Sequence, residues 1–112
     1  MSRYQDEINP HTVHIYALLD PTVSDNRVFY IGKTRCELSE RLHLHNTAAR
    51  KGKPTKTCDR IRRILSVGHK PEIRLIVDVN STVSRNVERE IIQNARNSGI
   101  ELTNMSAGGG GG

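Results

Sequence analysis

Aromatic residues are scarce in this chain, which has three Tyr, one Phe and no Trp among its 112 residues. Proteins that bind single-stranded nucleic acid stack successive bases on several exposed rings, so this composition argues against that class. Cysteine is scarce too, with only Cys36 and Cys58. Two cysteines in a chain without a signal peptide indicate reduced thiols and not a disulfide framework.

Long apolar runs are also missing. No segment approaches the roughly 20 consecutive apolar residues that a membrane-spanning helix needs. Residues 1–10 are polar and contain no apolar stretch of the signal-peptide type. The length fits a single compact domain. We therefore expect one cytoplasmic domain with no membrane partner.

Acidic residues are in the minority, because Lys and Arg number 17 against 12 for Asp and Glu. The isoelectric point is about 9.6. A basic domain of this size suits a polyanion, since each phosphate that a protein neutralises releases counterions. Nucleic acid is the first candidate partner, although charge alone fits a merely soluble basic protein equally well.

Alternating apolar residues predict strands in the first third of the chain and again near its middle. The first strand spans 12–19, the second 28–31 and the third 73–79, where Ile73, Leu75, Val77 and Val79 are expected to share one face. Turn residues between the first two strands, from Asp20 onward, predict an antiparallel hairpin.

Three segments have the spacing of amphipathic helices. The first is expected over 35–49, with Thr34 as N-cap and Glu37 completing a capping box. The second begins near Thr57 and stops at Gly68. The third covers 83–97, with apolar residues at four-residue spacing.

The resulting order, ββααβα, predicts an α+β fold in which three helices flank a small, mainly antiparallel three-stranded sheet. Residues 1–11 are expected to be a flexible lead-in, and 12–107 the folded domain. The glycines at 108–112 form no packed structure and suggest a tail or the start of a linker to a C-terminal targeting domain.

Several short motifs occur in a fixed order along this domain. They are His14-Ile15-Tyr16, Tyr30-Ile31-Gly32, Arg41 with His45, Glu90, and Asn104. The ordered set resembles the GIY-YIG nuclease domain over almost the whole chain, with His14 in place of the first name-giving glycine. The resemblance implies an enzyme that hydrolyses DNA phosphodiester bonds with one divalent metal ion, Mg²⁺ or Mn²⁺, held by Glu90. It also implies a bacterial or phage-infected cell, and a phage or mobile-element origin is among the options.

The residue types suit that chemistry. Attack on a phosphodiester needs a deprotonated water, neutralisation of charge on the phosphoryl oxygens and help for the leaving oxygen. Arg41 offers a planar fork of donors for phosphate, and Lys33 adds a point charge. Either Tyr16 or Tyr30 is a candidate base; we assign Tyr16 as base and Tyr30 as a positioning hydroxyl.

The remaining catalytic candidates are His45, as a proton relay or phosphate ligand, and Asn104, as an amide that orders the site. Helix periodicity does not choose between Glu88 and Glu90, which border opposite sides of the third helix's apolar stripe. The family resemblance selects Glu90 as the metal ligand. A zinc site made of Cys36, His43, His45 and Cys58 is disfavoured, because the spacing lacks a close cysteine pair.

A run of cations between the first helix and the third strand is expected to contact the DNA backbone. With Lys33, the DNA-binding candidates are Lys51, Lys53, Lys56, Arg60, Arg62 and Arg63. No segment looks like a base-reading module, so weak sequence preference is expected. The alternative function is a non-catalytic, basic nucleic-acid-binding module with the same fold.

Overall fold

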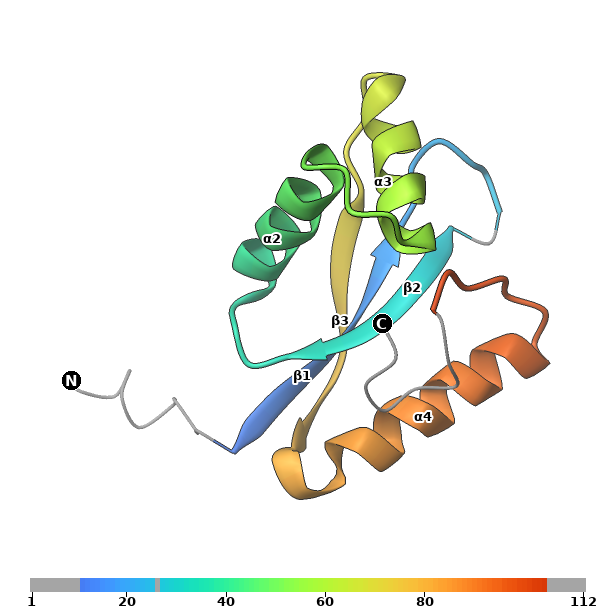
Figure 1. Cartoon of the computed structure of the whole chain (residues 1–112). Helices are drawn as coiled ribbons and strands as arrows, with labels where there is room; N and C mark the ends of the chain where they lie inside the picture. Colours follow the sequence, from blue (N-terminus) through green and yellow to red (C-terminus); the bar gives the residue numbers. More distant parts are fainter. Residues whose placement is uncertain (1–10, 26, 105–112) are drawn as a thin grey trace.

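The computed structural model describes residues 11–25 and 27–104 (Figure 1). Strands β1 (Thr12–Leu19) and β2 (Val28–Thr34) are followed by helices α2 (Leu38–Arg50) and α3 (Lys56–Ser66). Strand β3 (Glu72–Asn80) and helix α4 (Ser81–Asn97) complete the chain order. The predicted α+β fold and the order ββααβα are confirmed. No helix in the described part of the chain is long and apolar enough to cross a membrane.

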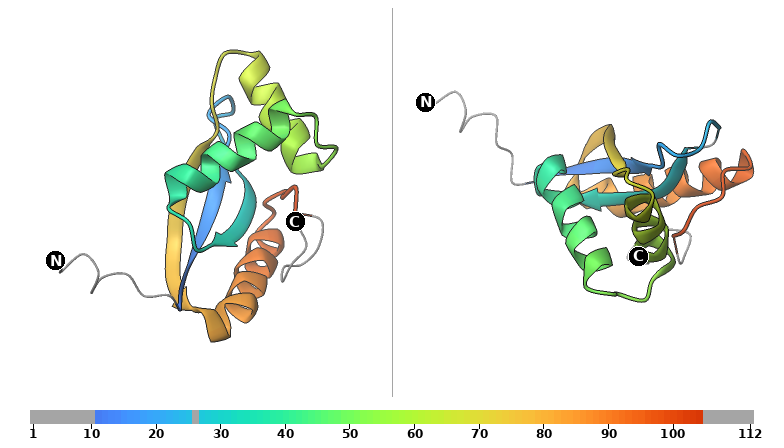
Figure 2. Two further views of the ribbon diagram at one scale, coloured as in Figure 1. Left: turned by 60° about the vertical axis from the view of Figure 1, so that its left-hand side comes forward. Right: turned by 90° about the horizontal axis from the view of Figure 1, so that it is seen from above.

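The three strands form one antiparallel sheet in the order β2-β1-β3, so β1 lies at its centre. The predicted hairpin joins β1 to β2, and the backbone N–H of Asp20 donates to the carbonyl of Arg27 at its turn (2.7 Å). Helices cover the sheet on two sides, and Figure 2 shows the α2–α3 pair lying together and apart from α4.

Alternate residues of β1 therefore belong to two separate cores. Tyr16 and Leu18 pack in a cluster with Ile61 and Ile64 of α3. Ile15, one residue earlier, packs instead with Ile31 of β2 and Ile92 of α4. The central strand is apolar on both faces because each face meets a helix layer.

Helix α2 begins three residues later than the predicted Arg35, and the predicted capping box is absent. The hydroxyl of Thr34 accepts a hydrogen bond from the backbone N–H of Cys36 (3.1 Å). Glu37 is the N-cap residue, in an extended conformation without a side-chain cap. The threonine closes a local turn at the end of β2 and so stands too early to cap the helix.

Strand β3 does not keep its predicted single apolar face. Ile73 packs against the cluster of Tyr16, whereas Val79 packs against the cluster of Ile15. The register explains the switch, because Tyr16 pairs with Leu75 while Ile15 pairs with Val77, which leaves Ile76 as an extra residue. A one-residue bulge reverses the alternation, since side chains along a strand repeat every two residues.

The boundaries of the folded region differ slightly from the predicted ones. Residue His11, predicted as lead-in, is tied to the start of α4, because its carbonyl accepts from the backbone N–H of Ser81 (2.6 Å). The remaining predicted lead-in, 1–10, and the glycine tail at 108–112 lie outside the described residues. Strand β2 extends three residues beyond the predicted end and thereby includes Gly32 and Lys33.

Gly32 occupies a position that admits no side chain. It pairs with Tyr16 across the β1–β2 ladder. A Cβ atom placed on Gly32 would lie 2.7 Å from the Tyr16 hydroxyl oxygen and 2.7 Å from the Tyr30 ring. The bare backbone of Gly32 therefore lets the Tyr16 ring lie across β2 beside Tyr30.

Candidate active site

Two tyrosines from the hairpin and two residues of α2 meet at one point. The Tyr16 hydroxyl lies 2.8 Å from Nε2 of His45, and Nε of Arg41 donates to the same hydroxyl (3.2 Å). The ring of His45 stands edge-on to Tyr30, with centroids 5.3 Å apart. Arg41 and His45 are one helical turn apart, as predicted, and so reach the hairpin from the same face of α2.

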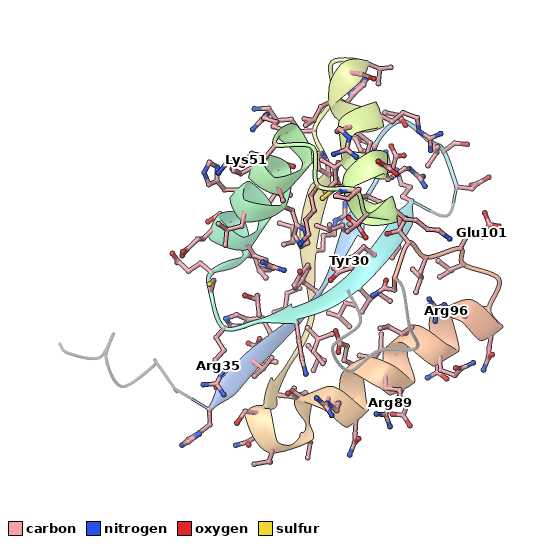
Figure 3. All side chains as sticks on the ribbon, viewed as in Figure 1. Tyr30, Arg35, Lys51, Arg89, Arg96 and Glu101 are labelled. Atoms are coloured by element: carbon pink, nitrogen blue, oxygen red, sulfur yellow. The ribbon has the colours of Figure 1, made fainter. Side chains whose placement is uncertain are left out.

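A cavity of about 350 Å³ opens beside this cluster. Tyr30, Lys33, Arg41 and His45 line it together with Glu88 of α4. Figure 3 shows Tyr30 on β2, between the α2–α3 pair and α4. Tyr16 is fully buried and does not line the cavity, whereas Tyr30 does. The tyrosine hydroxyl at the cavity is therefore that of Tyr30, and Tyr16 lies beneath it.

Glu90, the predicted metal ligand, does not line this cavity. Glu90 is exposed, whereas the side chain of Glu88 is only 6 % exposed and lines the cavity. Helix α4 turns Ser84, Glu88 and Ile92 inward. Residues two apart on a helix point about 200° from each other, so only one of the two carboxylates can face the tyrosines.

The inward row of α4 is visible in the sequence only as Ser84, Glu88 and Ile92 at four-residue spacing. Sequence periodicity favours the more apolar row of Val83, Val87 and Ile91, yet Val83 is 45 % exposed. A buried carboxylate has no hydrophobic signature, and the cations that surround it come from β2 and α2. Glu88 is thus the site residue that pattern analysis failed to choose.

Asn104 orders the site through β2 and does not enter the cavity. Its amide oxygen accepts from the backbone N–H of Ile31 (3.1 Å), and its amide nitrogen donates to the carbonyl of the same residue (2.7 Å). Ile31 lies between Tyr30 and Gly32, so this double hydrogen bond fixes the backbone that carries both. His14 also lies outside the cavity and bonds to Asp78 of β3 (2.5 Å).

Burial sets the protonation of the cluster. It raises the pKa of Tyr16 above its ordinary value, with a further rise from Tyr30, although Arg41 opposes both. Burial also raises the pKa of Tyr30. Arg41 opposes this rise, and Glu88 adds to it. Burial and the positive charges of Arg41 and Lys53 lower the pKa of His45 to about 4. At neutral pH the imidazole is therefore neutral and both phenols keep their protons.

Five of the seven predicted DNA-binding cations divide into two groups. Lys33 and Lys53 line the cavity, while Lys51, Lys56 and Arg63 are exposed on the surface. Figure 3 shows Lys51 at the end of α2, outside the site. The first group adds positive charge where Arg41 already stands, and the second remains open to a polyanion.

Arg60 and Arg62, two of the predicted DNA contacts, bond to partners within the domain. Arg60 donates to the buried carboxylate of Asp20 (2.6 Å) and its guanidinium lies over the Phe29 ring. Arg62 donates to the carbonyl of Ala49 at the end of α2 (2.8 Å) and also pairs with Asp59. Each of these two guanidinium groups therefore uses at least one of its donors within the domain.

Glu88 is the carboxylate that the cavity offers to a metal ion. Among residues 11–25 and 27–104, no three or more His, Cys, Asp or Glu side chains gather as a metal-binding group. Of the zinc-type residues, Cys58 is buried and His43 is exposed on α2. Glu88 supplies one carboxylate, and Mg²⁺ commonly accepts one or two carboxylates and keeps several waters.

Comparison with protein-family models, curated proteins and solved structures gave no match for this chain. The geometry and chemistry of the cavity are therefore the grounds on which a function is assigned. The cavity brings together a buried carboxylate, three cations, the phenol of Tyr30 and a neutral imidazole, and the phenol of Tyr16 lies beneath them.

Replacing Arg60 with alanine is expected to lower the free energy of unfolding by about 2–3 kcal/mol, because the buried Asp20 loses its partner. Arg63→Ala, on the exposed side of the same helix, should change it by less than about 0.5 kcal/mol. Urea denaturation of both variants measures the difference. Equal stabilities would show that the Arg60–Asp20 pair contributes nothing to the fold.

The Arg60 effect should depend on pH. Burial pushes the pKa of Asp20 up, but hydrogen bonds from Thr22 and the charge of Arg60 outweigh it and leave that pKa below its ordinary value. A depressed folded-state pKa gives stability that is present above the unfolded value of about 3.9 and is lost as pH falls through the folded value. The difference between the parent protein and Arg60→Ala should therefore shrink in acid.

Proposed function

We propose that this protein is a divalent-metal-dependent endonuclease of the GIY-YIG type that hydrolyses DNA phosphodiester bonds. The observation that carries the proposal is the position of Glu88, a buried carboxylate that faces the same cavity as Arg41, Lys33 and Tyr30. Burying a carboxylate is costly unless its charge is compensated. A surface that only bound phosphate would gain nothing from this negative charge.

The charge of the cavity favours a phosphate-bearing substrate. Lys33, Arg41 and Lys53 contribute three cations against the single carboxylate of Glu88. Arg41 is held by its hydrogen bond to Tyr16, so part of its guanidinium is fixed before a substrate arrives. A preorganised guanidinium stabilises charge that develops on phosphoryl oxygens without reorganisation during the reaction.

The residues present fit a single Mg²⁺ or Mn²⁺ ion. Glu88 would hold it, because its carboxylate is the acidic group of the cavity and hard cations prefer oxygen ligands. Such an ion supplies Lewis-acid stabilisation of negative charge on the phosphodiester.

The protein's own groups divide the remaining work. The Tyr30 hydroxyl reaches the cavity and positions the attacking water or a phosphate oxygen by hydrogen bonding. Tyr16 acts as a positioning residue, since its buried hydroxyl accepts from Arg41 and lies within hydrogen-bond distance of His45. The neutral imidazole of His45 keeps an unprotonated nitrogen, which can accept a hydrogen bond from the Tyr16 hydroxyl.

Glu88→Gln is expected to abolish plasmid nicking, with a loss of at least about a hundredfold, because the metal loses its anchoring carboxylate. Glu90→Gln is the matched control, and an exposed helical carboxylate of this kind is worth under about 1 kcal/mol. Nicking of supercoiled plasmid with Mg²⁺, with Mn²⁺ and with chelator measures both variants at equal folded concentration.

Two results would count against the nuclease proposal or its metal ligand. DNA binding by the parent protein without cutting under any metal, from neutral to alkaline pH, would identify a non-catalytic binding module. An inactive Glu90→Gln beside an active Glu88→Gln would assign the metal to the exposed carboxylate.

Tyr30→Phe should lower the single-turnover cleavage rate by about a hundredfold with little change in DNA affinity, because only a hydroxyl at the reacting centre is removed. Tyr16→Phe should affect rate and affinity together, since Arg41 loses the oxygen that holds it. Rates at saturating DNA and affinities measured in chelator separate the two cases. A larger rate loss in Tyr16→Phe with unchanged affinity would make Tyr16 the base.

The double variant Lys33→Ala/Lys53→Ala should bind duplex DNA more weakly and with a flatter salt dependence. Each lost phosphate contact should reduce the slope of log K against log salt by about 0.9. Lys70→Ala, an exposed lysine in the loop between α3 and β3, is the control and should keep the parent slope. An unchanged slope in the double variant would place the DNA elsewhere.

A further inference from the structure

The cavity extends well beyond Tyr30, Arg41 and His45. Beyond His45 it continues between α2 and the first turn of α3. Leu44 and Ala48 of α2, together with Cys58 of α3, give this part of the cavity apolar surface. We call these three residues, with the neighbouring Thr55 and Thr57, the inner wall. Hydrolysis of a phosphodiester by the groups described above makes no use of the inner wall.

The two hydroxyls of the inner wall already have partners within the domain. Thr55 accepts from the backbone N–H of Cys58 (3.1 Å), and Thr57 is bonded to Thr103 (2.8 Å). The inner wall therefore offers mainly apolar surface, and both of its hydroxyls already have a partner within the domain. A ligand bound there is selected more by its shape, and by whether it can reach the cavity, than by hydrogen bonds to the edge of its ring.

The size of the cavity exceeds what a phosphate group needs. At about 350 Å³ it falls within the range of small-molecule sites, which is roughly 300–1,000 Å³. A phosphodiester placed at Arg41 and Glu88 leaves the inner wall uncovered. In a DNA strand, the flat and largely apolar group next to a phosphodiester is the base of the flanking nucleotide. Lys53 lines the same cavity and can contact the next phosphate.

We propose that the inner wall receives the base of one unpaired nucleotide beside the cleaved bond. The substrate class is then DNA with a local interruption of pairing, such as a single-nucleotide bulge. A base within an intact duplex cannot enter a cavity unless it is first unpaired and unstacked, and that cost is smallest where pairing is already broken. This inference rests on the proposed nuclease function for the cutting step but not for the binding step.

The test compares two end-labelled duplexes of one sequence, one fully paired and one with a single unpaired thymidine. The bulged duplex should be cut at least about tenfold faster, and at a bond next to the bulge, because its base needs no unpairing. Replacing the unpaired thymidine with adenosine should change the rate by no more than about threefold, since apolar contact with the inner wall does not distinguish one base from another.

Ala48 offers a matched pair of variants. Ala48→Leu fills the space at the inner wall and should bring the bulged-to-paired ratio of cleavage rates close to one. Ala48→Ser keeps the space and should preserve the ratio. Thermal unfolding of both variants checks that the domain is intact, and the comparison of the two duplexes by the parent protein does not depend on either variant.

Binding measured in chelator separates this inference from the nuclease proposal. Fluorescence anisotropy with the same two duplexes should show about tenfold tighter binding to the bulged one, and Ala48→Leu should lose this preference. Selective binding without any cleavage would support the inner wall and refute the nuclease. Cleavage of both duplexes at equal rates would overturn the inner-wall proposal and leave the nuclease standing, and absence of both would refute both.

Discussion

The hydroxyl of Tyr16 is the point at which three elements of this protein meet. The phenol is carried by the central strand, lies over the bare backbone of Gly32 in β2, and is bonded to Arg41 and His45 of α2. A buried hydroxyl without a partner would be destabilising, so the two bonds and the ring's burial support one another. The positions of α2 and of the cavity that it lines depend on this arrangement.

Burial also decides the electrostatics around this point. The same low-polarity surroundings that raise the pKa values of the two tyrosines lower that of His45 to about 4. Arg41 reinforces the effect on His45, because a neighbouring cation disfavours a second positive charge. The cluster thus combines neutral proton-carrying groups with the cation of Arg41 and the carboxyl group of Glu88, and the proposed hydrolysis would use both.

The basic character of the chain has two physical uses. Arg60 and Arg62 hold the hairpin turn, α2 and α3 together through Asp20 and the carbonyl of Ala49. Lys33 and Lys53 instead contribute charge to the cavity. The net charge is therefore larger than the number of cations free to contact a polyanion would suggest. Guanidinium groups carry several donors and are well suited to bridging elements of the fold.

The sequence by itself determined the types and order of the elements and most of the cluster around the Tyr16 hydroxyl. Strand alternation and helix spacing are local properties, and the one-turn separation of Arg41 and His45 follows from helix geometry alone. The bulge at Ile76, the inward turn of Glu88 and the internal partners of Arg60 were decided only by the tertiary structure. The bulge depends on the pairing of β3 with β1, and the other two depend on the compensation of a buried carboxylate by cations. These partners lie far away in the sequence, so no local pattern reveals them.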